Sequence, residues 1–131
     1  MKKYITLICS FLLFLTSCTY QPRLKLCNNT GHDIVIELNN KITKLASGAV
    51  KTMWIDGYSL SLSVSNDQKV WNYSTLGLDD IPEKYRPYTS IIIHAQIEHD
   101  GLIYLFPPGT KFPQNDLSTQ SDNFMIKPLK M

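Results

Sequence analysis

The segment Ser59-Leu60-Ser61-Leu62-Ser63-Val64-Ser65 decides the fold class of this chain. Its polar and apolar residues alternate strictly, and side chains alternate between the two faces of a β-strand with the same period of two. Leu60, Leu62 and Val64 therefore share one face, while the four serines share the other. The segment is predicted to be a strand with one face in a core and one face in water.

The same pattern recurs along the chain between short turns such as Asn39-Asn40, Asp56-Gly57 and His99-Asp100-Gly101. Further strands are predicted over 24–27, 34–38, 41–45, 50–56, 69–74, 91–97 and 102–106. The chain is therefore predicted to be all-β, a small antiparallel β-sandwich or barrel of about seven or eight strands. Only the stretch 76–90 departs from this pattern, and its Asp79-Asp80, Pro82 and Pro87 predict at most one short helical turn.

The N-terminus is typical of an export signal. Lys2 and Lys3 precede the short apolar run 5–15, which ends in Leu15-Thr16-Ser17-Cys18. The run is too short to span a bilayer as a helix, which needs roughly 20 apolar residues. A plain secretory signal or a short buried segment is the alternative interpretation.

Leu15-Thr16-Ser17-Cys18 resembles the lipobox of bacterial lipoproteins. The resemblance covers only the N-terminus, and it implies that residues 1–17 are removed and that Cys18 is acylated. Residue 19 steers sorting in Gram-negative members of that class. Thr19 at this position implies the outer membrane where the host has one.

These features give a domain plan for the chain. A removed signal peptide, 1–17, precedes a lipidated cysteine and short tether, 18–22, a single β domain, 23–112, and a polar C-terminal tail, 113–131. The tail is rich in Gln, Asn, Ser, Thr and Asp and is expected to be peripheral. Phe124, Met125 and Ile126 are its residues that could dock on the sheet.

The charge of the mature chain excludes one class of function. The whole chain has 13 Lys and Arg against 11 Asp and Glu, and the signal contains Lys2 and Lys3 but no acid. The mature chain is therefore close to neutral and has no stripe of cations to neutralise phosphates, so no nucleic-acid partner is expected.

No catalytic, metal or cofactor site is predicted. Cys27 is the one cysteine left after the signal and Cys18, and it is expected to be a small apolar residue in or beside the core. His94 and His99 are five residues apart near a strand end and are not expected to point to one side, and no serine lies in a nucleophile-elbow pattern. The protein is predicted not to be an enzyme.

Aromatic residues are the remaining lead to a binding site. Trp71, Tyr73, Tyr85 and Tyr88 lie on one predicted strand and in the loop after it. Exposed, they would form a patch for a protein or glycan partner; packed between two sheets, they would be core. Trp54 is out of phase with Met53 and Ile55 and could likewise face the second sheet or be exposed, but it is not one of the four patch residues.

Three functional classes follow. The favoured one is an envelope lipoprotein whose domain binds an envelope or membrane protein close to the bilayer. A module for a small ligand or a cell-wall glycan is the alternative, and a hydrolase with an unrecognised site is the least favoured.

Overall fold

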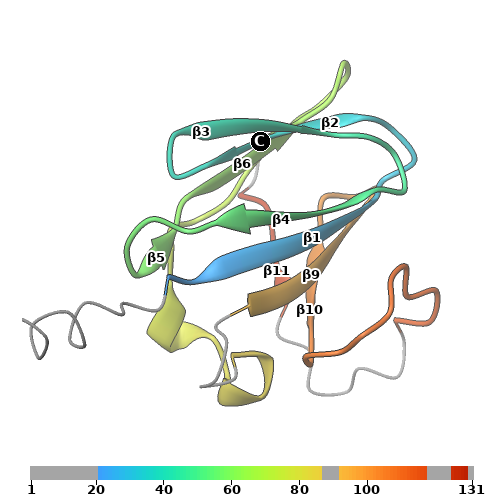
Figure 1. Cartoon of the computed structure of the whole chain (residues 1–131). Helices are drawn as coiled ribbons and strands as arrows, with labels where there is room; N and C mark the ends of the chain where they lie inside the picture. The colour runs from blue at the N-terminus through green and yellow to red at the C-terminus, as the bar shows by residue number, and fades with distance from the viewer. Residues whose placement is uncertain (1–20, 87–91, 118–124, 130–131) are drawn as a thin grey trace, which may run out of the picture.

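The computed structural model describes residues 21–86, 92–117 and 125–129. These residues form strands and two short 3-10 turns (Figure 1). The elements in chain order are β1 (Arg23–Asn29), β2 (Ile34–Leu38), β3 (Lys41–Leu45), β4 (Val50–Trp54), β5 (Ser59–Leu60), β6 (Leu62–Ser65), β7 (Val70–Asn72), β8 (Leu76–Gly77), η1 (Leu78–Asp80), η2 (Glu83–Tyr85), β9 (Ile92–Glu98), β10 (Ile103–Phe106) and β11 (Met125–Ile126). The predicted residues 1–17, Cys18, Thr19, Tyr88 and Phe124 lie outside the described residues.

The strands form two facing sheets and a small ribbon. Sheet A has the order β11-β10-β9-β1-β4, sheet B has the order β3-β2-β6-β7, and β5 pairs with β8. The prediction of an all-β sandwich is confirmed (Figure 1). Strands exceed the predicted number because β8 and β11 carry no period-two signal and because the predicted strand 59–65 forms two strands, β5 and β6. The described residues 76–86 contain two 3-10 turns in place of one.

The core lies between the inward rows of the two sheets. On sheet B, Ile36 is opposite Val64 and Leu38 is opposite Leu62 in the register, and all four side chains are buried. The inward row of β9 is Ile93, Ala95 and Ile97, each with no exposed surface. The inward residues of β1, β9 and β10 face those of sheet B, so each sheet removes the apolar face of the other from water.

The predicted strand 59–65 is split at Ser61. Its backbone N–H donates to Oδ1 of Asn39 at 2.8 Å and its carbonyl accepts from the Asn39 N–H at 2.9 Å. Asn39 thus takes over both backbone groups of Ser61, so β5 is free to pair with β8 while β6 joins sheet B.

One pairing differs from the antiparallel prediction. β1 and β9 are parallel, with Leu24 opposite Ile93 and Leu26 opposite Ala95. A parallel pair needs a long crossover, and here the whole of sheet B together with β5, β8 and the two 3-10 turns separates the two strands in sequence. Strand periodicity contains no information on direction, which explains the error.

The segment predicted as a tail is partly built into the fold. The backbone N–H of Gln114 donates to Oε1 of the buried Gln96 at 2.8 Å, and β11 pairs with β10. Pro128 then bridges to Tyr73, and the Leu129 N–H donates to the Asn72 carbonyl at 2.7 Å. The C-terminal segment therefore links the edges of the two sheets.

The sandwich has two distinct ends. At the proximal end, where the described chain begins, the Pro22 carbonyl accepts from the Ile55 N–H at 2.9 Å and the Asn39 amide donates to the Asp56 and Ser59 carbonyls. The opposite, distal end is formed by the turns 30–33, 46–49, 66–69 and 99–101. In Figure 1 β1 runs from the first end to the second.

Candidate functional site

The predicted aromatic patch is not on the surface. Trp71, Tyr73 and Tyr85 are only 4%, 7% and 5% exposed, and Tyr88 lies outside the described residues. The register explains this burial, because Trp71 is opposite Val64, whose side chain points inward, while Val70 points outward. Of the two alternatives, core packing holds for these three side chains, and a binding surface made from them is ruled out.

Trp71 and Tyr73 fix the turn between β9 and β10. The Tyr73 hydroxyl donates to the Gly101 carbonyl at 2.6 Å, and the Trp71 indole lies against the α-carbon of Gly101 so closely that a β-carbon there would be 2.5 Å from Cδ1. Burial of the phenol, with Asp100 as a lesser cause, raises the pKa of Tyr73 above its ordinary value. The hydroxyl therefore stays protonated and serves as a structural donor.

The histidines do not assemble a catalytic group. His94 is buried against Phe112, with 6.4 Å between the stacked rings, and its Nδ1 lies 3.2 Å from the Ile92 carbonyl. Burial is the main cause that lowers the pKa of His94, Lys25 adds to the lowering, and the backbone contact opposes it. His94 lies on the outer face of β9, opposite to Ile93, and is covered there by Phe112 of the 107–117 segment. Within residues 21–86, 92–117 and 125–129 no group of three His, Cys, Asp or Glu side chains could hold a metal ion.

Cys27 is a buried thiol. Its side chain is 1% exposed, and burial raises its pKa, with the nearby Glu98 carboxylate as a smaller cause. Reactive cysteines need the opposite, a lowered pKa and access to solvent. The expectation of a small packing residue fits this setting.

Asn28 joins two loops at the distal end of the sandwich. This fully buried side chain donates from Nδ2 to the carbonyls of His32, Leu45 and Ala46 at 2.7, 3.1 and 3.2 Å, and its Oδ1 accepts from the N–H and the hydroxyl of Thr30. Asp33 adds a further link by accepting from the Ser47 N–H at 2.9 Å. The loops 30–33 and 46–48 are thereby held in fixed positions beside each other.

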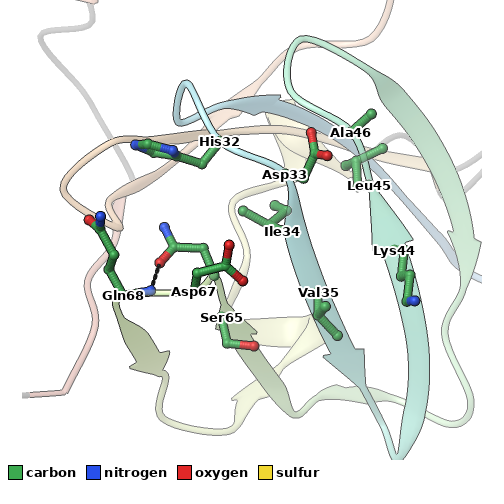
Figure 2. A pocket seen from close by; sticks show the side chains of 11 residues that line it. His32, Asp33, Ile34, Val35, Lys44, Leu45, Ala46, Ser65, Asp67 and Gln68 are labelled. Carbon is green, nitrogen blue, oxygen red and sulfur yellow. Dashed lines mark hydrogen bonds between the residues drawn. The ribbon is translucent and has the colours of Figure 1, made fainter.

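A polar cleft of about 820 Å³ lies against these loops on the outer face of sheet B. Figure 2 shows its floor on the strands, with Val35, Lys44 and Ser65, and its rim on the loops, with His32 and Gln68. The register places Val35 directly between Lys44 and Ser65. The other lining residues are Asp33, Ile34, Leu45, Ala46, Asn66 and Asp67.

The third wall of the cleft is the β6–β7 turn. Oδ1 of Asn66 accepts from the N–H groups of Gln68 and Lys69 at 2.9 and 2.8 Å, the first of which is drawn in Figure 2. These bonds shape the turn from within, while the side chains of Asp67 and Gln68 stay exposed at the rim. The cleft therefore offers two carboxylates, one amine and several amide or hydroxyl groups, a mixture suited to a polar partner.

Two exposed aromatic side chains were not predicted as a site. Trp54 is 53% exposed on the edge strand β4, and Tyr58 is 86% exposed in the loop that follows. The Arg23 guanidinium lies 5.2 Å from the centre of the Trp54 ring, its partner in the β1–β4 register. The sequence does place Trp54 on the face of its strand opposite to Met53 and Ile55, which are buried in the structure.

No helix in the described part of the chain is long and apolar enough to cross a bilayer. Comparison of the chain with protein-family models, with curated proteins and with solved structures finds no match.

Proposed function

We propose that the protein is a bacterial envelope lipoprotein, anchored through acylated Cys18, whose domain is a non-enzymatic module that binds another envelope protein. The observation that carries this proposal is the position of the polar cleft. It lies at the distal end of the sandwich, whereas the described chain begins at the proximal end. A lipid attached before residue 21 would hold the domain on the membrane and leave the cleft facing away from it.

The chemistry of the cleft favours a protein segment over a small ligand. Small-ligand sites are mostly enclosed and apolar with a few polar groups, whereas this cleft is open and its rim is polar. None of its eleven lining residues is Trp, Tyr or Phe, so it has no platform on which a sugar ring of a cell-wall glycan would stack. A polar peptide or loop, with both cationic and anionic groups, would match Asp33, Asp67 and Lys44.

The settings of the histidines and of Cys27 support a non-enzymatic role. His94 and Cys27 are covered by protein, and no hydrogen bond links His32 or His99 to a serine or cysteine in the described part of the chain. Nucleophilic catalysis needs such a pair within hydrogen-bond reach.

Site-specific crosslinking in intact cells tests the role of the cleft. A photoreactive residue at position 68, on the rim, is expected to capture one envelope protein, while the same residue at position 52, on the outer face of sheet A, captures none. Asp67→Lys is expected to weaken that capture about tenfold, because it reverses a charge at the rim without removing a bond that shapes the turn. Equal capture at both positions would reject the cleft as the binding site.

The anchor needs its own test. Cys18→Ala is expected to move the protein from the membrane fraction to the soluble or precursor fraction, and mass spectrometry of the native protein is expected to find acyl chains on residue 18. An N-terminal peptide that retains residues 1–17 without modification would refute the assignment.

A further inference from the structure

We propose that the proximal end of the sandwich contacts the bilayer directly, with Trp54 and Tyr58 in the layer of phospholipid headgroups and Arg23 at the lipid phosphates. This inference rests on the lipid anchor of the proposed function and adds an orientation to it. We call Arg23, Trp54 and Tyr58 the proximal patch.

The length of chain before the domain brings this patch to the membrane. Cys18 precedes Pro22 by four residues, which span at most about 14 Å when fully extended. Pro22 is hydrogen-bonded to Ile55, the residue after Trp54. A lipid on Cys18 therefore keeps Trp54 within reach of the bilayer surface, whichever way the domain turns on its tether.

The side chains of the proximal patch suit the membrane interface. Trp and Tyr are enriched where hydrocarbon meets water, because their rings are apolar and their N–H or O–H groups are polar. Trp54 and Tyr58 are the two exposed aromatic residues among the large hydrophobic side chains of the described chain. β4 is an edge strand, so Trp54 has a neighbouring strand, β1, on one side only, and its ring is exposed enough to enter the interface.

Arg23 adds a cation that has no ion pair among the described residues. Its guanidinium lies over the Trp54 ring, its buried Nε has no hydrogen-bond partner among the described residues, and no described carboxylate forms an ion pair with it. The neighbouring cation Lys41 is different, since its Nζ is paired with Asp56 at 3.0 Å. Because Nε is buried, a lipid phosphate would accept hydrogen bonds from the terminal Nη groups of the guanidinium, while the indole enters the headgroup layer.

The aromatic rings, and not net charge, are expected to dominate this contact. The 3-10 segment that follows β8 lies beside the proximal patch, because the Leu78 N–H donates to the Tyr58 carbonyl. Its charged residues are the acids Asp79, Asp80 and Glu83 and the bases Lys84 and Arg86. With Arg23 these residues make three acids and three bases at the proximal end, and the Lys41–Asp56 pair adds one of each. The contact should form on zwitterionic phosphatidylcholine as well as on bilayers that contain anionic phosphatidylglycerol.

Because the chain is tethered to the bilayer, even weak membrane binding by the proximal patch is enough to orient the domain. Two aromatic side chains do not hold a free protein on a bilayer, but a short tether converts their binding into an intramolecular event at high effective concentration. The patch thus sets the orientation, and the lipid supplies the affinity. The distal cleft would then point into the aqueous compartment.

Trp54 is its own reporter for the test. The chain has two tryptophans, one exposed at position 54 and one buried at position 71. The acylated full-length chain is reconstituted in phosphatidylcholine vesicles, with or without phosphatidylglycerol, whose acyl chains carry bromine close to the headgroup. The Trp54 contribution is the emission of the wild type minus that of Trp54→Phe.

The Trp54 contribution is expected to fall about twofold or more in brominated vesicles of either composition, because bromine quenches only indoles that enter the interface. The emission of Trp54→Phe, which comes from Trp71, should stay unchanged. Ile42→Ala, at an exposed position of sheet B, is the control that should keep the quenching. Near-ultraviolet circular dichroism checks that each variant is folded.

The outcomes separate the anchor from the patch. If the chain sediments with vesicles but Trp54 is not quenched, the acyl anchor is supported and the lipid contact of the proximal patch is refuted. A chain that carries no acyl group and stays in solution overturns both. Crosslinking from position 54 to a membrane protein in cells, without quenching in pure lipid, would assign the proximal patch to a protein partner and overturn the lipid contact.

Discussion

Gly101→Ala is expected to be among the most destabilising single-methyl additions in this chain. Gly101 has φ of +82°, where an L-residue costs about 1 to 2 kcal/mol. Its new β-carbon would also lie 2.5, 2.6 and 2.8 Å from Cδ1, Nε1 and Cε2 of the buried Trp71 ring. Relief of such overpacking costs about 1 to 3 kcal/mol more, for a total of about 2 to 5 kcal/mol.

Gly109 provides a matched control. It has the same φ of +82°, but a β-carbon there would meet no atom within 4 Å. Gly109→Ala should therefore cost only the backbone term, about 1 to 2 kcal/mol. Urea unfolding followed by circular dichroism gives both free energies of unfolding, and their difference isolates the contact with the indole.

A second substitution tests whether the Trp71 ring causes the extra cost of Gly101→Ala. Trp71→Leu removes the ring, so in that background the cost of Gly101→Ala should fall towards the cost of Gly109→Ala. Equal costs for the two glycines in the native background would mean that the indole is not held against the turn. The burial of Trp71, and with it the rejection of the aromatic patch, would then be wrong.

Three further outcomes are expected. Asn28→Ala should lower the free energy of unfolding by about 2 to 4 kcal/mol, because three loop carbonyls and the Thr30 N–H lose a buried partner. A loss below about 1 kcal/mol in urea unfolding would contradict this hydrogen-bond network. The pKa of His94 is lowered in the folded state, so at acidic pH the unfolded chain binds more protons than the folded one. The free energy of unfolding should therefore be unaffected by His94 above its unfolded pKa of 6.5 and should fall as the pH drops below that value. His94→Gln should flatten this part of the pH profile, whereas the exposed His99→Gln should not. Cys27 should react with iodoacetamide at least about a hundredfold faster in urea than in the native state, and rapid native labelling would show that the outer face of sheet A is open there.

The sequence predicts most of the sheet content for a simple reason. Strands that bury one face must alternate, so Ile34, Ile36, Leu38, Leu62 and Val64 mark their own strands and inward faces. Strand ends agree within one or two residues for most elements. The short strands β8 and β11 are missed because two residues show no period.

Properties that depend on the order of strands in space are beyond such a pattern. Parallel pairing of β1 with β9 follows from the path of the whole chain and not from either strand. Phase separates Trp54 from Met53 and Ile55, and Trp71 from Val70 and Asn72, and the structure shows Trp54 exposed and Trp71 buried. Phase alone could not state which face of each strand meets the other sheet.

The cleft was also missing from the sequence-based interpretation, because its walls come from loops far apart in the chain. The cleft depends on Asn28, Asp33 and Asn66, which are residue types common in turns and do not by themselves indicate a binding site. Only the fold brings the carbonyls of Leu45 and Ala46 to the Asn28 amide. A single sequence shows that such residues favour turns, but not which turns meet.

The edges of the sandwich constrain how a partner can bind. On one side of the sandwich the edge strands are β3 and β4, and each places a lysine on its inward side: Lys41 is opposite Leu38 and Lys51 is opposite Leu26 in the register. A strand added to either edge would enclose an amine against the core, which is a common protection against edge-to-edge association. The other side of the sandwich is occupied by the C-terminal segment at Pro128 and Leu129. Recognition by strand addition is therefore disfavoured on both sides, and a protein partner is left with side-chain surfaces such as the distal cleft.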